Sequence, residues 1–271
     1  MKTMTIEELA SWAFVHELPK GGGVDGLDNA NSAWRMLEAT SWGRINSFAE
    51  LMTLVDGGRR DHENFFIEQG APHDDALAVG EAVAGLARCE AIIPEGWAAL
   101  ADWPDTGGLA EAAVARVAER YRLRPFRQRA ASLMSLVIGT AVLGKRPDWS
   151  APVSKVRMVE RGGRPAWFVE KAVTDVFGRR SLIEVDGLHP RSRRPVRGAY
   201  RKYELSDDPT GDILSRLDWQ LWVAAMRYLE GNLALALVAH RFAPFDERMT
   251  PWLSHEGAGV RLLELAGAAK N

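Results

Sequence analysis

Cysteine is nearly absent from this sequence, since Cys89 is the one cysteine in 271 residues. A single thiol excludes an internal disulfide, and it also excludes the cysteine-rich ligand sets of zinc fingers. Histidine is scarce as well, and no two of the six histidines lie three to five residues apart, the spacing of a local zinc site. The sequence therefore predicts no metal and no other cofactor from local motifs, and it leaves open a metal site assembled from distant residues.

Long apolar runs are also missing. The longest one, 130–144, lies between Arg129 and Lys145 and is shorter than the roughly 18–20 residues that a bilayer requires. The first eight residues contain no apolar core ahead of a small-residue cleavage site, so they do not form a signal peptide. We expect a soluble cytoplasmic protein that makes no membrane contact, and a reducing compartment suits the single cysteine.

Catalytic signatures are absent in the same way. There is no G-x-S-x-G elbow, and the glycine-rich segment 20–23 lacks the Lys-Ser/Thr pair of a phosphate-binding loop. Residues 61–63 (Asp-His-Glu) and 73–75 (His-Asp-Asp) place carboxylates beside imidazoles, a pattern that is more often a solvated loop or a helix cap. No catalytic residue is predicted. An enzyme would need a cleft lined by His62 or His73, with carboxylates of shifted pKa.

What the sequence does contain is a strong charge asymmetry. Residues 116–202 hold 21 of the 34 Lys and Arg residues but only 7 of the 36 Asp and Glu residues. The middle of the chain is therefore strongly basic and its flanks are acidic. Such asymmetry indicates a polyanionic partner, or else pairing between the basic middle and the protein's own acidic surface. Both interpretations stay open at this point.

Two basic surfaces are candidates for nucleic-acid contact. The first surrounds the break that Pro125 forces between two helices, and its residues are Arg122, Arg124, Arg127 and Arg129. The second is a loop held extended by two prolines, followed by a basic pair, and its residues are Arg191, Arg193, Arg194, Arg197, Arg201 and Lys202. The loop is the favoured surface, because the helix after Pro125 is too apolar to lie along a major groove.

Hydrophobic periodicity predicts an α+β fold in two regions, 1–150 and 151–271, which form one continuous domain or two. The first region is mostly helical. The second is expected to hold a small antiparallel sheet of three or four strands, packed on a long helix that starts at Asp208-Pro209. More than six strands, or a parallel sheet, would contradict this arrangement. The expected elements are helices over 6–15, 32–39, 74–89, 109–121, 127–143 and 259–268, and strands over 156–158, 167–169, 182–185 and 199–205.

Several short motifs resemble a known group of proteins. They are Pro72-His73-Asp74-Asp75-Ala76-Leu77, Gly163-Arg164-Pro165-Ala166-Trp167-Phe168, Glu184-Val185-Asp186-Gly187, Ala199-Tyr200-Arg201-Lys202 and Pro251-Trp252. With these motifs, most of the chain resembles uncharacterised proteins from prophage-like regions of alphaproteobacterial genomes. The resemblance implies a mobile-element setting, and it carries over no activity, cofactor or catalytic residue.

The leading hypothesis is a non-enzymatic DNA-binding or transcription-regulating protein of a phage or mobile element, which contacts the DNA backbone through its basic centre. The first alternative is a protein–protein interaction module, either a partner of the host transcription machinery or a component of a phage particle. The second alternative is an enzyme with a dispersed active site. The salt dependence of DNA binding separates the first two hypotheses, because phosphate contacts release counterions.

Overall fold

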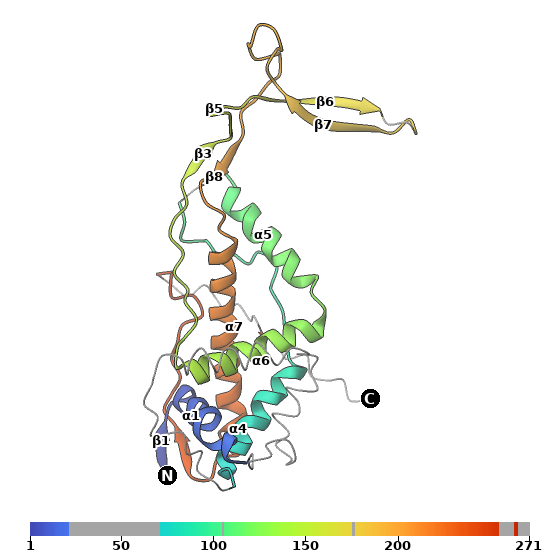
Figure 1. The fold of residues 1–271 in the computed structure, drawn as a ribbon. Helices are drawn as coiled ribbons and strands as arrows, with labels where there is room; N and C mark the ends of the chain where they lie inside the picture. Colours follow the sequence, from blue (N-terminus) through green and yellow to red (C-terminus); the bar gives the residue numbers. More distant parts are fainter. Residues whose placement is uncertain (22–70, 105, 175–176, 255–262, 265–271) are drawn as a thin grey trace, which may run out of the picture.

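A computed structural model describes residues 1–21, 71–104, 106–174, 177–254 and 263–264 of the chain. These parts form a helical body from which a β arm projects (Figure 1). The helices of the body are α1 (Ile6–Trp12), α4 (Asp74–Gly85), α5 (Leu109–Arg122), α6 (Phe126–Leu143) and α7 (Thr210–Leu233). The arm spans residues 156–205 and lies between α6 and α7 in the sequence.

Helix α7 forms the centre of the body and contacts the other four α-helices. Its apolar stripe is buried at Leu217, Leu221, Trp222, Met226, Leu229 and Leu233. Burial of each of these side chains contributes about 1.5–3 kcal/mol, so this stripe accounts for a large share of the stability of the body. The surrounding helices α1, α4 and α6 present buried side chains to the same cluster.

Local sequence signals set most of the helix ends. Thr5 and Glu8 form a capping box, with Thr5 N donating to Glu8 Oε2 (2.9 Å) and Glu8 N donating to Thr5 Oγ1 (3.1 Å). Pro125 separates α5 from α6, and Gly144 ends α6 in the left-handed region (φ 59°). Beyond α1 the chain continues through a π-helical turn (Ala13–Glu17) and a 3-10 turn (Leu18–Gly21).

The strands are short and occur as five separate pairs. In the body, β1 (Lys2–Met4) pairs in parallel with β9 (His240–Phe242), and β2 (Glu90–Ala91) pairs antiparallel with β10 (Leu263–Glu264). In the arm, β3 (Val156–Met158) pairs with β8 (Tyr203–Leu205), β4 (Glu160–Arg161) with β5 (Arg164–Pro165), and β6 (Phe168–Thr174) with β7 (Arg180–Asp186). All three arm pairs are antiparallel.

The mixed helical and antiparallel character matches the predicted class, but the predicted single sheet packed on the long helix is wrong. The described residues contain ten strands, and one pair is parallel. Helix α7 packs on helices, so the expected sheet residues are left exposed, among them Val156 (43%), Met158 (38%) and Ile183 (43%). Helix α7 packs on four neighbouring helices, so its apolar stripe is buried without a sheet. Side-chain alternation identifies a strand but does not specify which surface that strand covers.

The main cluster of buried residues draws on both of the predicted regions, because α1, α4 and α6 share it with α7. A second cluster joins α5 and residues 99–103 to Ile213 of α7. Within the part of the chain that the structure describes, no helix is long and apolar enough to span a membrane. The helix predicted over 32–39 lies outside the described residues, and the one over 259–268 is wrong at Leu263 and Glu264, which form β10.

Candidate nucleic-acid interface on the β arm

The basic loop, residues 188–200, is held in shape by its own backbone hydrogen bonds. His189 N donates to Arg194 O (2.9 Å), and Arg193 N donates to His189 O (2.9 Å). Leu188 and Pro195 form a β-bridge. Arg193 has φ 55°, a left-handed conformation that is uncommon for a residue other than glycine. The loop is therefore an ordered turn, and its side chains project from a defined backbone.

Four arginines of this loop project into solvent. Arg191, Arg193, Arg194 and Arg197 are all exposed. They form no ion pair with any residue that the structure describes. Residues 187–203 contain no Asp or Glu at all. The loop thus presents guanidinium groups without compensating carboxylates, which is what a phosphate contact requires.

The basic pair that follows the loop has a different role. Arg201 lies over the ring of Trp167, with 4.6 Å from its guanidinium carbon to the ring centroid, and Lys202 forms an ion pair with Glu184. Lys202 also lies 5.3 Å from the centroid of Phe168. These contacts join β6 and β7 to the end of the loop, so Arg201 and Lys202 stabilise the base of the arm.

Some arginines of the predicted surface at the α5–α6 joint already have hydrogen-bond or ion-pair partners within the protein. Arg122 donates to the carbonyl oxygens of Ile93 and Pro94 (3.1 Å each), and Arg129 pairs with Glu90 (2.6 Å). Arg124 and Arg127 are exposed, and Arg124 lies 5.8 Å from the centroid of the Tyr121 ring. Two of the four arginines therefore tie the joint to residues 90–94.

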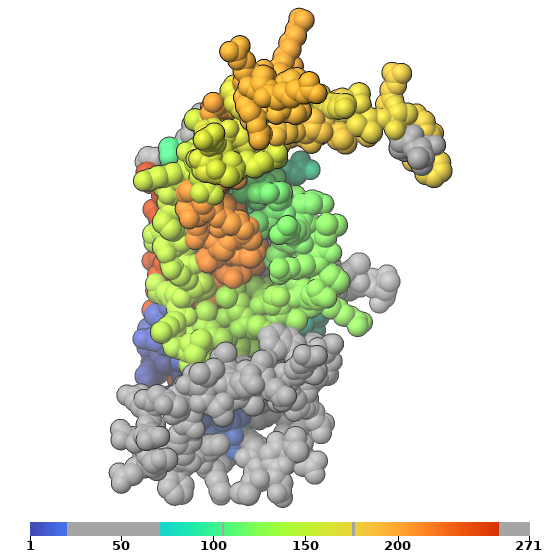
Figure 2. Space-filling model, turned by 45° about the horizontal axis from the view of Figure 1, so that its top comes forward, coloured from blue at the N-terminus to red at the C-terminus, as the bar shows by residue number. Residues whose placement is uncertain are grey.

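The two predicted surfaces do not come together. The arm begins near the N-terminal end of α5, which contacts β8, whereas the joint with α6 lies at the opposite end of that helix (Figure 1). A space-filling view shows the arm standing clear of the helical body (Figure 2). The loop and the α5–α6 joint are therefore two separate surfaces.

A buried cluster that sequence reasoning missed joins the start of α4 to β9. The ligand atoms of His73, Asp75 and His240 lie within 4.8 Å of one another, and Trp12 packs against both imidazole rings. His73 and Asp75 belong to a sequence pattern that is typical of a helix cap. His240 is 165 residues away from Asp75, so no local sequence pattern connects the two. Only the β1–β9 pairing, which positions His240, brings them together.

The hydrogen bonds of this cluster connect the start of α4 to residues 238–240. Asp75 accepts from the backbone N–H groups of Val238 (2.7 Å), Ala239 and His240 (3.0 Å each), and its Oδ2 lies 2.7 Å from His240 Nδ1. His73 is the N-cap of α4, with its Nδ1 accepting from Asp75 N (3.0 Å).

The lone pair of His73 Nδ1 is engaged by the hydrogen bond from Asp75 N. The carboxylate and both Nδ1 atoms are already used. We therefore interpret the cluster as a clasp, named here the Asp75 clasp, that holds β9 against the start of α4.

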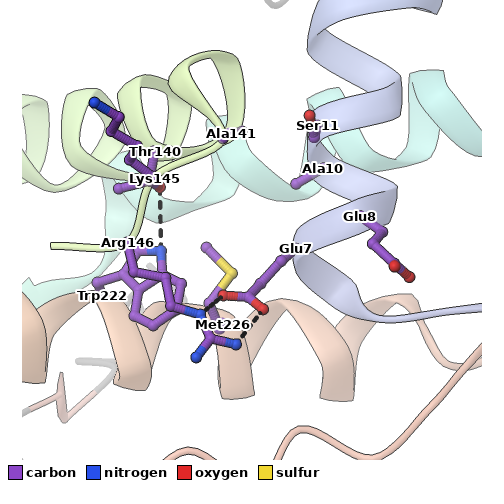
Figure 3. A pocket seen from close by; sticks show the side chains of 11 residues that line it. Glu7, Glu8, Ala10, Ser11, Thr140, Ala141, Lys145, Arg146, Trp222 and Met226 are labelled. Atoms are coloured by element: carbon purple, nitrogen blue, oxygen red, sulfur yellow. Dashed lines mark hydrogen bonds and ion pairs between the residues drawn. The ribbon is translucent and has the colours of Figure 1, made fainter.

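Two cavities of moderate size lie in the body. One of about 260 Å³ is bordered by α1, α6 and α7, with Arg146 and Trp222 in its wall (Figure 3). Arg146 donates to Glu7 twice (2.8 Å each) and to Glu247 (2.6 Å), so its charge is neutralised within the protein. The other, of about 380 Å³, lies along α5 beside Trp97. Neither is lined by His73, and His62 lies outside the described residues.

Comparison of the chain with protein-family models, curated proteins and solved structures gives no match.

Proposed function

We propose that this protein is a non-enzymatic DNA-binding or regulatory protein of a phage or mobile element, and that it contacts the DNA backbone through the basic loop of its arm. One observation carries the proposal: Arg191, Arg193, Arg194 and Arg197 are exposed and unpaired within the described part of the chain, on an ordered loop without carboxylates. Guanidinium groups of this kind form strong charge-assisted hydrogen bonds to phosphate oxygens.

The position of the loop favours backbone contact over reading of bases. The loop lies on an arm that projects from the helical body (Figure 2), and residues 187–203 hold no carboxylate, so little within the loop competes with DNA for its arginines. Phosphate contacts fix where a protein sits on DNA but carry little sequence information. We therefore expect binding of moderate strength, strong dependence on salt and low specificity.

The test is DNA binding by fluorescence anisotropy at several salt concentrations, with the wild-type chain and with a variant in which all four loop arginines are alanine. The wild-type affinity should fall steeply as salt rises. The variant should bind more weakly, and its log–log salt slope should flatten by about 0.9 for each phosphate contact that is lost. Thermal stability should change little, because exposed charges contribute little to folding.

A matched control removes the same charge from α5 and the competing joint. In this control Arg116, Arg120, Arg124 and Arg127 become alanine, and all four are exposed on α5, at the joint or at the start of α6. It should retain most of the affinity. If the control loses binding while the loop variant keeps it, the joint is the interface. If the wild-type chain does not bind DNA even at low salt, the proposal is wrong.

A second candidate, a protein–protein interaction module, is favoured by a different observation. Phe177 and Leu182 in the β6–β7 hairpin are 84% and 69% exposed. Large apolar side chains on a projecting hairpin are typical of surfaces that bury against another protein. A host transcription component or another protein of a phage particle would be such a partner, and absence of DNA binding would favour this candidate.

A further inference from the structure

The ribbon formed by β6 and β7 is a feature that DNA contact does not explain. Residues 168–186 hold three Lys or Arg residues and four Asp or Glu residues, so the ribbon is not cationic. Its strands pair over seven residues and extend from the base of the arm away from the body (Figures 1 and 2). An isolated two-stranded ribbon is only marginally stable in water, which indicates that it gains a partner.

The cross-strand register divides the ribbon into two unlike faces. Val169 lies opposite Val185, and Lys171 lies opposite Ile183. Paired residues share a face and neighbours along a strand alternate, so one face carries Val169, Val173, Ile183 and Val185 together with Lys171 and Ser181. The other face is more polar, with Glu170, Thr174, Arg180 and Glu184 beside Ala172 and Leu182, so the ribbon is amphipathic.

The two edges of the ribbon also differ. The outer edge of β6 is already occupied at Phe168, which exchanges two backbone hydrogen bonds with Tyr200 (2.8 and 2.9 Å). Within the described part of the chain, β7 pairs with β6 alone. A strand edge of this kind is a template for another strand.

We propose that the partner is a second copy of this chain, and that the two β7 strands pair antiparallel across a two-fold axis at Ile183. In this register Leu182 lies opposite Glu184 of the second copy, and Arg180 lies opposite Asp186. The two-fold axis repeats the Arg180–Asp186 pair, so each end of the contact holds one pair of opposite charges. The same arrangement on β6 would place Lys171 opposite itself, which is unfavourable.

Both partners of this charge pair are accessible. Arg180 and Asp186 are exposed. Asp186 Oδ1 accepts from Leu188 N (3.0 Å), and its Oδ2 lies 3.9 Å from Arg161, a solvent-exposed pair of little energetic weight.

Pairing with a second copy also stabilises the ribbon. An isologous contact uses the same patch on both copies, as two-fold dimers do. Two ribbons joined through β7 make one four-stranded antiparallel sheet, and the apolar residues of both copies lie on one face. Three or more strands with an apolar face reach the size at which a sheet is stable, which a lone ribbon does not.

The test is sedimentation of the full chain without DNA, from dilute to concentrated solution. We expect a monomer–dimer equilibrium. Arg180→Asp places like charges opposite each other, and Asp186→Arg does the same with the opposite sign. Each single variant should lower the association constant roughly tenfold or more, because two pairs are reversed at once. The double variant, and an equimolar mixture of the two single variants, should associate like the wild type.

Lys171→Glu on β6 is the matched control, and it should leave association unchanged. A cysteine pair tests the register directly. In a Cys89→Ala background, Ile183→Cys should form a disulfide between copies, since residues opposite each other in an antiparallel pair lie about 4.5–5.5 Å apart. Lys171→Cys should not. The proposal would be overturned if the chain stays monomeric, or if the changes at Arg180 and Asp186 leave the association constant of the dimer unchanged.

Discussion

Asp75 is the residue on which the joint between α4 and β9 most depends. Burial raises the pKa of its carboxyl, but hydrogen bonds from Val238, His240 and Ala239 outweigh burial and bring the pKa below its ordinary value of 3.8. The side chain is fully buried, at 0% exposure. The ionised form is thus the one that the folded protein stabilises.

The pH dependence of stability follows from this direction. A carboxyl whose pKa is lower in the folded state stabilises the fold above its unfolded pKa, and this contribution is lost as pH falls through the folded pKa. We expect Asp75→Asn to cost about 3 kcal/mol at neutral pH, because several N–H donors lose a charged acceptor. Urea unfolding at neutral pH and below about pH 4 measures the effect, and the variant should approach the wild type in acid.

Asp74→Asn is the control, since Asp74 is an exposed neighbour on the same turn. It should change stability by less than about 1 kcal/mol. Equal losses in the two variants would mean that the clasp does not depend on the Asp75 carboxylate.

Single residues were predicted well from sequence only where their partners are local. Thr5 and Glu8 are three residues apart, and this Thr/Glu spacing is the sequence signature of the capping box that they form. Asp75 was expected only as part of a solvated or capping acidic group, because all four of its hydrogen-bond partners belong to residues 238–240. Arg122 and Arg129 were candidates for nucleic-acid contact for the same reason, since their acceptors lie on a separate segment.

At the scale of elements, Gly187 sets how closely the arm strands approach. A Cβ on Gly187 would lie 2.9 Å from the backbone atoms of Phe168. Gly187 N also donates to Trp167 O (2.8 Å), and its carbonyl accepts from Val196 N (2.9 Å) in the basic loop. The loop is therefore positioned through this glycine.

Gly187→Ala should loosen the arm and leave the helical body intact. The backbone of Phe168 cannot yield as a flexible side chain would, and overpacking of this kind costs about 1–3 kcal/mol. Hydrogen exchange followed by mass spectrometry should show faster exchange in 168–200 and no change in α7. Gly139→Ala on α6, where a Cβ meets nothing within 4 Å, serves as the control. Unchanged protection in the arm would contradict the role of Gly187.

Helices proved more predictable than strand pairing because the two depend on different information. The ends of α5, α6 and α7 follow from Pro125, Gly144 and Asp208, which act within a few residues. The strand residues around Gly162-Gly163 were recognised, but β3 pairs with β8, whose residues lie more than forty positions on. Alternation identifies a strand without naming its partner, so the arm itself was not predictable from sequence.

At the scale of the whole molecule, the β3–β8 pair connects the body to the rest of the arm. Met158 and Tyr203 lie opposite each other at the end of this pair that is farther from the body. Residues 159–202 can therefore be replaced by an Asn-Gly turn, which closes antiparallel strands. Ala151 and Leu205, which pack against the second core cluster, are retained.

This shortened chain should keep the helical body and lose DNA binding. We expect the same circular dichroism per helical residue, cooperative unfolding and a Tm within a few degrees of the full chain, because no core residue of α1, α4, α6 or α7 is removed. The full chain is the reference. A truncated chain that fails to unfold cooperatively would show that the arm is part of the body's fold, and retained DNA affinity would place the interface outside the arm.

The β3–β8 pair also bears on the order in which the chain folds. Helix α6 ends at Leu143 and α7 begins at Thr210, so docking one on the other closes a loop of more than sixty residues. Once β3 and β8 pair, only 144–155 and 206–209 remain to be closed. Each doubling of loop length costs about 0.6 kcal/mol of chain entropy, so early pairing lowers the cost by roughly 1 kcal/mol. The effective contact order of the α6–α7 contact is then close to that of an ordinary helical hairpin, and α7 can dock before the rest of the arm is ordered.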